Sequence, residues 1–119
     1  MIIQVKKDPR YRIKMSFLKK TAQEILKDFG LSKSVELGIA LVGKRKAKSL
    51  NQTFRKQDYV PAVLSFPYRE ETLEKNYLLG EVVICFPLAR EKAVLENQTL
   101  ERAMADLLKH GIKNLVNIE

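Results

Sequence analysis

The sequence predicts an α+β fold in a single domain, with a mixed four-stranded sheet packed against about four helices. Short β-rich runs alternate with segments whose apolar residues recur at helical spacing, in the order strand, helix, strand, helix, two strands, two helices. The 119 residues can bury a two-layer core without disulfides, and no repeat, low-complexity tract or linker divides them. We therefore expect residues 1–119 to form one domain.

The N-terminal part begins with a short strand and the clearest helix of the chain. Residues 2–5 are β-rich, and Pro9 follows them as a residue that cannot donate a ladder hydrogen bond. A helix is expected over residues 17–29, where apolar residues return every three or four positions. Ser16 is its expected N-cap, and Gly30 provides a left-handed stop.

A second strand and a second helix are expected on either side of Gly43. Residues 35–42 place apolar side chains at alternate positions, which is typical of a strand with one buried face. The helix is predicted over residues 44–55, and its apolar positions Ala47, Leu50 and Phe54 share one side. Its first turns carry cations that oppose the helix dipole, so local stability does not explain them.

The C-terminal half is predicted to hold an antiparallel strand pair and two helices. The pair comprises residues 62–66, ended by Pro67, and residues 78–86, with a long polar connection over 67–76. The last helix has Thr99 as its expected N-cap. The two helices are expected over residues 88–95 and 100–116.

The positive charge of the chain is large and unevenly distributed. The formal net charge is +8, and cations gather in residues 6–14, at Lys19 and Lys20, and in residues 44–48. Such a field attracts polyanions, and nucleic acid is the leading candidate, although a solvated lysine-rich surface is an open alternative. The cations expected to contact RNA beside Arg55 are Lys44, Arg45, Lys46 and Lys48.

Composition also narrows the cellular setting. Cys85 is the single cysteine, so no intramolecular disulfide can form and no CxxC pair offers a zinc-ribbon or redox site. The N-terminus has no signal-peptide pattern, and no apolar stretch reaches the length of about 18 residues needed to span a bilayer. We expect a cytoplasmic protein that does not engage a membrane.

The last helix carries a polar edge that includes the single histidine. Asp106, His110 and Asn114 follow one another at intervals of four residues, so their side chains lie on one face. A catalytic zinc normally takes three protein ligands, and a carboxamide is a poor zinc ligand. Asp106 could instead hold His110 by a hydrogen bond, so a boundary histidine and a metal ligand both remain open.

Four blocks together carry a family resemblance. They are residues 51–58 (Asn-Gln-Thr-Phe-Arg-Lys-Gln-Asp), 63–67 (Val-Leu-Ser-Phe-Pro), 79–84 (Leu-Gly-Glu-Val-Val-Ile) and 107–111 (Leu-Leu-Lys-His-Gly). In this order and spacing the chain resembles the bacterial YbeY-type rRNA maturation endoribonucleases. The resemblance implies a small zinc-dependent α+β enzyme that cuts single-stranded RNA and assists ribosomal RNA processing and quality control of the small subunit.

The resemblance also implies a zinc-ligand pattern, and this chain departs from it. Members of the family bind zinc in a basic groove through three histidines, the first of which matches His110. The second position is occupied by Asn114 and the family's aspartate by Glu119, and the third histidine would follow Glu119, the last residue here. Zinc is therefore expected to be absent or weakly bound.

Arg55 matches the functionally important arginine of the family. A guanidinium can hold a phosphate by two parallel hydrogen bonds and stabilise charge that develops in phosphodiester cleavage, so we expect a phosphate clamp. The alternative is an exposed cation that suits the C-terminal end of a helix. Ser65 is not expected to act as a nucleophile, because no histidine is near it in the sequence.

Three functions follow from these observations. The favoured one is an rRNA maturation factor that binds ribosomal RNA, the small ribosomal subunit or a ribosomal protein, with impaired or lost metal-dependent cleavage. The second is an active metal-dependent endoribonuclease in which His110, Glu119 and an unusual third ligand such as Asp106 hold the ion. The third is a protein-interaction module, since aromatic residues that could stack on bases are few.

Overall fold

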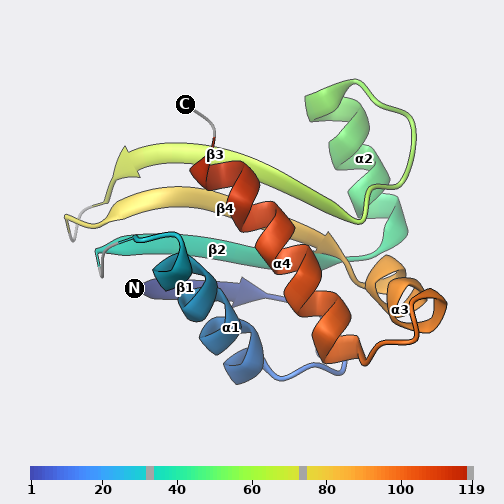
Figure 1. The fold of residues 1–119 in the computed structure, drawn as a ribbon. Coiled ribbons are helices and arrows are strands. Elements are labelled where there is room, and N and C mark those ends of the chain that lie inside the picture. The colour runs from blue at the N-terminus through green and yellow to red at the C-terminus, as the bar shows by residue number, and fades with distance from the viewer. Residues whose placement is uncertain (32–33, 73–74, 118–119) are drawn as a thin grey trace.

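The structure, a computed structural model, describes residues 1–31, 34–72 and 75–117. It contains four strands and four helices within these ranges (Figure 1). In chain order they are β1 (Ile2–Lys6), α1 (Met15–Asp28), β2 (Val35–Val42), α2 (Lys44–Arg55), β3 (Val63–Glu71), β4 (Tyr77–Cys85), α3 (Phe86–Leu95) and α4 (Leu100–Val116).

The strands form one mixed sheet in the order β1-β2-β4-β3. The strands β1, β2 and β4 run parallel, and β3 is an edge strand antiparallel to β4. The predicted α+β class, with a mixed four-stranded sheet and four helices, is confirmed. Because the three parallel strands end at the same edge of the sheet, the segments that follow them are brought together there.

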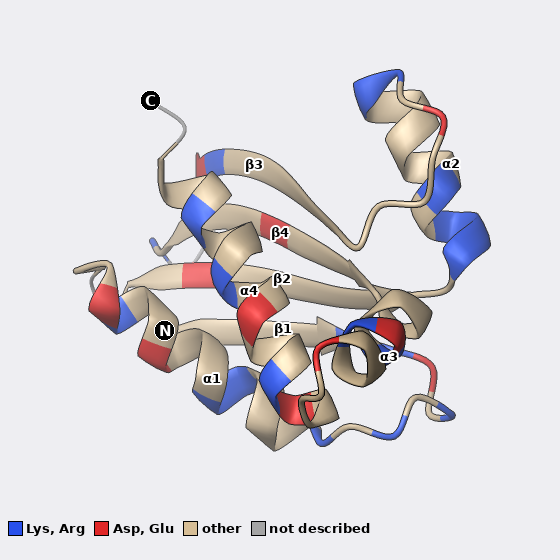
Figure 2. Cartoon of the chain, turned by 45° about the vertical axis from the view of Figure 1, so that its right-hand side comes forward, with Lys and Arg blue, Asp and Glu red and all other residues tan. Residues whose placement is uncertain are grey.

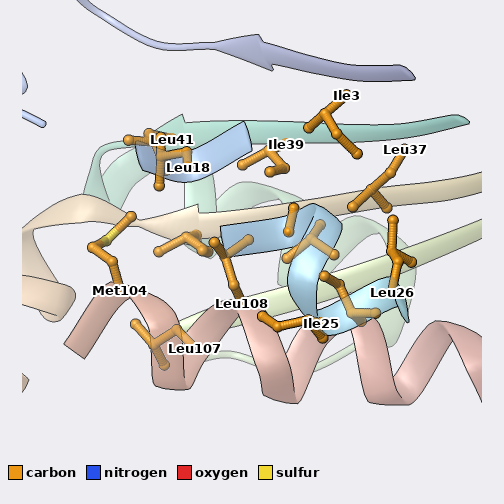
Figure 3. Close-up of a cluster of buried hydrophobic side chains, with 14 of the residues drawn as sticks. Ile3, Leu18, Ile25, Leu26, Leu37, Ile39, Leu41, Met104, Leu107 and Leu108 are labelled. Carbon is orange, nitrogen blue, oxygen red and sulfur yellow. The ribbon is translucent and has the colours of Figure 1, made fainter. Parts of the chain in front are cut away.

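The helices α1 and α4 cover one face of the sheet and form the core with it (Figures 1 and 3). The side chains of β2 alternate between buried and half-buried, as the sequence predicted for residues 35–42. Figure 3 shows the side chains of this layer meeting between the helices and the strands. Its fully or almost fully buried members include Leu18, Leu26, Leu37, Ile39, Met104 and Leu108.

The helix α2 lies away from this layer, and its inward side differs from the predicted one. Ala47 is buried and Leu50 is half-buried, as expected, but Phe54 is 63% exposed. The fully buried position one turn from the end belongs to Asn51, whose side-chain amide donates to the carbonyl oxygen of Tyr59 at 3.1 Å. Phe54 instead meets the edge of Phe66, with ring centroids 5.3 Å apart.

Two predicted helix starts are wrong. The helix α1 begins at Met15, with Lys14 as an N-cap that makes no side-chain cap, so Ser16 lies inside the first turn. The helix α3 begins at Phe86 instead of residue 88, because Pro87 fits the first turn of a helix, where its missing N–H has no partner to lose. The expected cap of α4 is confirmed: the Thr99 hydroxyl accepts from the backbone N–H of Arg102 at 3.1 Å.

The predicted end of β3 at Pro67 is also wrong. The strand continues to Glu71, and Pro67 pairs with Gly80 of β4. An edge strand tolerates proline because one side of its backbone has no neighbour to receive an N–H. The pairing is irregular between Pro67 and Glu70, where Arg69 has a φ of 52°. The connection between the two strands is therefore much shorter than residues 67–76.

Within residues 1–31, 34–72 and 75–117, no helix combines the length and the apolar character that a membrane-spanning segment needs.

Candidate functional site

A hollow of about 410 Å³ lies where the end of α2, the start of β3 and the last turns of α4 meet. These three segments are far apart in the sequence, and the fold brings Arg55, Ser65, His110 and Asn114 to one place. The described residues that line it are Arg55, Val63, Leu64, Ser65, His110, Asn114 and Asn117. We call it the Arg55 hollow.

The close approach of α4 to the sheet places His110 and Asn114 at this hollow. At Gly111 a Cβ atom would lie 2.5 Å from Cγ1 of Val82 and 3.1 Å from Cγ2 of Val63, so only glycine fits without movement. The Ser65 hydroxyl donates a 2.8 Å hydrogen bond to the carbonyl oxygen of Gly111. Ser65 therefore has a structural partner, although the fold places it in the same hollow as His110, from which it is distant in the sequence.

Arg55 is the last residue of α2, and the segment that follows fixes the end of this helix. Lys56 adopts a left-handed conformation with φ 58°, which ends α2 and turns the chain toward β3. Asn51 ties the helix to this segment through the carbonyl oxygen of Tyr59, and the Gln52 amide donates to a carboxylate oxygen of Asp58 at 2.7 Å. The loop thus holds the backbone of α2 near Arg55.

The Arg55 hollow has a positive electrostatic character. None of its lining residues carries a carboxylate. Within the described part of the chain, the Arg55 guanidinium makes no ion pair, and Lys109 and Lys113 are exposed on α4 beside His110. Since an unpaired guanidinium keeps all its donors available, the hollow can accept an anion such as a phosphate.

The residues present do not fit a zinc ion. His110 is the only nitrogen or sulfur ligand that lines the hollow; Asn114 and Asn117 offer amide oxygens, which zinc rarely uses in proteins. No group of three His, Cys, Asp or Glu residues able to hold a metal occurs among the described residues. Glu119, one of the expected ligand positions, lies outside the described residues, and we derive no reaction step through zinc.

Asp106 does not support either role suggested for it. Its carboxylate accepts from the Gln98 amide at 3.1 Å and lies 3.4 Å from Arg102 and 3.6 Å from Lys92. Within the described residues it makes no hydrogen bond with His110, and it does not line the Arg55 hollow. The polar edge of α4 is therefore divided, with Asp106 turned toward α3 and His110 and Asn114 toward β3.

The basic cluster of α2 is not part of the hollow. With a rise of about 1.5 Å per residue, Lys44 and Arg55 lie about 16 Å apart along the helix axis. Lys44 is 3.4 Å from Glu91 of α3, at the opposite end of α2 from the hollow. The cations Lys44, Arg45, Lys46 and Lys48, which the sequence grouped with Arg55, therefore form a separate surface.

Two residues of the site were not singled out as functional by the sequence. Asn117, the C-cap of α4, lines the hollow, and Asn51 anchors the helix that carries Arg55. Asn51 had a usable signal, because a polar residue four positions after the buried Ala47 stands on the inward side of the helix. Asn117 had none, since its position depends on how closely α4 approaches β3.

The fold and the hollow define a small α+β protein with a cationic site at one edge of its sheet. The family model described as Endoribonuclease YbeY matches residues 3–117. The chain therefore belongs to the YbeY endoribonuclease family, and the predicted family resemblance is confirmed.

Similar proteins agree over most of the chain. The Endoribonuclease YbeY of Acinetobacter baumannii (strain AB307-0294) is 32% identical over 117 residues, which cover 95% of this chain and 74% of that protein. The Endoribonuclease YbeY of a Sulfurihydrogenibium species is 35% identical over 107 residues, covering 90% and 70%. The solution structure of TM1509 from Thermotoga maritima matches with a TM-score of 0.64 and 29% identity, covering 99% of this chain and 74% of that one.

Proposed function

We propose that this protein is an rRNA maturation factor that binds ribosomal RNA or the small ribosomal subunit in the cytoplasm, with metal-dependent RNA cleavage impaired or lost. One observation carries the proposal: among the described residues, Arg55 makes no ion pair and lines a hollow that has no carboxylate and only His110 as a residue that zinc commonly uses as a ligand. Family membership supports a role in rRNA maturation. The hollow keeps the phosphate-binding part of the site without a zinc-ligand set among the described residues.

Each polar residue of the hollow can make a different contact with RNA. Arg55 holds a phosphate through two parallel hydrogen bonds, which a lysine cannot reproduce. The amides of Asn114 and Asn117 can donate to phosphate or ribose oxygens and accept from base or ribose groups. His110 supplies a further donor, and Lys109 and Lys113 add long-range attraction to the phosphate backbone.

Binding of a single-stranded rRNA fragment, measured by fluorescence anisotropy at several salt concentrations, tests this function. We expect affinity that falls steeply with salt, drops at least tenfold in Arg55→Ala and recovers only in part in Arg55→Lys. A chelator should leave the affinity unchanged. Arg102→Ala is the matched control, because Arg102 is an exposed arginine on α4 that pairs with Asp106 outside the hollow.

Two results would overturn the proposal. Absent or salt-insensitive RNA binding would remove its basis, and a ribosomal protein retained by the purified chain after nuclease treatment would then favour the interaction module. Cleavage of the same fragment that stops with chelator and returns with zinc would establish the active endoribonuclease instead. That alternative is favoured by the position of His110 and Arg55 in one hollow.

A further inference from the structure

A second cationic surface lies at the edge of the sheet where the three parallel strands end. The segment of residues 7–14 follows β1, α2 follows β2 and α3 follows β4, so all three begin at this edge. Figure 2 shows lysine and arginine on the first turns of α2, on α3 and on the segment after β1. We call this the carboxyl-edge surface; its cations are Lys7, Arg10, Arg12, Lys14, Lys44, Arg45, Lys46 and Arg90.

An aromatic contact joins the three segments into one surface. The ring of Tyr11 stacks on that of Phe86, with centroids 4.5 Å apart and planes inclined by 18°, and the guanidinium of Arg90 lies 5.3 Å from the centroid of Phe86. The Tyr11 hydroxyl is close to the start of α2, since it would lie 3.2 Å from a Cβ placed on Gly43. The segment after β1 is thereby fixed against both helices.

Six of the eight cations on the carboxyl-edge surface have no carboxylate partner among the described residues. Arg10 pairs with Asp8 at 2.7 Å, and its hydrogen bonds lower the pKa of that carboxyl to about 2; Lys44 pairs with Glu91. The exposed cations that make no ion pair in the described ranges are Arg12, Lys14, Arg45, Lys46 and Arg90, and the half-buried Lys7 donates to the carbonyl oxygen of Tyr11 at 3.2 Å.

The position of these cations costs stability. Arg45 and Lys46 stand in the first turn of α2, which has no acidic residue and no side-chain cap, so they oppose the helix dipole. A hollow of about 590 Å³ beside Tyr11 is lined by Lys7, Arg12 and Lys14, with Glu101 as its only carboxylate. Cations that neither cap nor pair remain free for a polyanion.

We propose that the carboxyl-edge surface binds the phosphate backbone of the same single-stranded RNA that occupies the Arg55 hollow. This inference rests on the proposed function. The helix α2 favours RNA over an acidic protein segment, because its cations extend from this surface to Arg55 at the hollow. Between them, Lys48 lies 3.6 Å from Asp58 and Lys44 lies 3.4 Å from Glu91, exposed pairs that a phosphate can replace. A regular array of phosphates can follow such a row over the distance of about 16 Å between its ends.

The test varies both the length of the RNA and the position at which positive charge is removed. Two double variants, Arg12→Gln/Lys14→Gln and Arg45→Gln/Lys46→Gln, each remove two of the unpaired cations of the surface. The control, Lys19→Gln/Lys20→Gln, makes the same charge change at exposed positions of α1. Each protein is titrated with a 20-nucleotide and a 3-nucleotide fragment of the same unstructured rRNA sequence, the short one without terminal phosphates, and the salt dependence of binding is recorded.

For the long RNA, each surface variant is expected to lose about tenfold in affinity, and the slope of log K against log salt should fall by about 1.4 for two lost single-strand phosphate contacts. The control should lose no more than twofold. The short RNA reaches the Arg55 hollow alone, so its affinity should be unchanged in the surface variants and reduced by Arg55→Ala. Circular dichroism and thermal unfolding verify that each variant is folded.

The outcomes separate this inference from the proposed function. If the surface variants bind the long RNA like the control while Arg55→Ala binds it weakly, the inference is overturned and the proposed function stands. An acidic protein partner at this surface would give that same result. If wild-type protein binds neither RNA, both are overturned.

Discussion

The hydroxyl of Ser65 on β3 donates a hydrogen bond of 2.8 Å to the carbonyl oxygen of Gly111 on α4. This contact joins the middle of the last helix to the edge strand, one residue from His110 and one turn from Asn114. A residue that lines the Arg55 hollow, Ser65, is thus hydrogen-bonded to the helix that forms another part of the lining.

Removing this hydroxyl should lower the free energy of unfolding without lowering the affinity for RNA. For Ser65→Ala we expect a loss of about 1 kcal/mol in the free energy of unfolding, the usual net contribution of such a hydrogen bond, measured by urea denaturation. RNA affinity should stay within twofold, because the hydroxyl is directed at Gly111. Ser16→Ala, at an exposed position of α1, is the control. Lost RNA binding without lost stability would show that Ser65 contacts the ligand.

Gly111→Ala should be destabilising even though alanine favours helices. At an exposed helix position this change would stabilise by about 1 kcal/mol, but here the new Cβ meets Val82 and Val63. We expect a net cost of about 1 to 3 kcal/mol from overpacking. Val82→Ala makes room, so the double variant should lose less than the sum of the two single losses in a denaturation cycle. If the stability losses of the two single variants are additive, Val82 is not the residue that the new Cβ contacts.

Asn114→His should create a metal-binding pair. His110 and residue 114 are four positions apart on α4, and both side chains are exposed at the hollow. With Zn²⁺ or Ni²⁺ at about 100 times its dissociation constant, the variant should gain about 2.7 kcal/mol in unfolding free energy, reversed by chelator. The double variant His110→Ala/Asn114→His should show no gain. An equal gain in wild-type protein would show that the chain already holds the metal.

Cys85 should react slowly in the folded protein. The side chain is 1% exposed, and burial raises the pKa of its thiol above the ordinary value. Because the thiolate is the reactive species, little of it is present at pH 8, and a thiol reagent should modify the native chain far more slowly than the chain in urea. As the pH rises, the native rate should increase only above the range in which an ordinary thiol ionises. Rapid native modification would contradict the described packing.

The sequence predicted the bounds of an element well where the periodic pattern of apolar residues extended over many positions. Residues 35–42, 44–55 and 100–116 were placed as the structure has them, because eight or more positions repeat the pattern. The errors of the element bounds fall at Ser16, Pro67 and Pro87, where local residue chemistry was used alone. Whether a strand lies at the edge of the sheet, and at which residue a helix begins, depends on tertiary packing. A single capping residue or proline does not predict either.

The candidate site was predictable as a set of residues but not as a location. Family blocks brought Arg55, His110 and Asn114 to attention, and the hollow contains all three. The cations of residues 44–48 were grouped with Arg55 because they are close to it in the sequence. In the structure they lie at the opposite end of α2 from Arg55. The partners of Asp106 and the anchoring role of Asn51 depend on contacts with α3 and with the loop at Tyr59.

The edge strand β3 has a consequence for how molecules of this protein meet one another. An open strand edge invites another chain to add a strand, and such additions lead to aggregates. Pro67 interrupts the row of donors on this edge, and the irregular pairing at Arg69 bends the strand. The features that made the end of β3 difficult to predict therefore also protect the sheet against growth by strand addition.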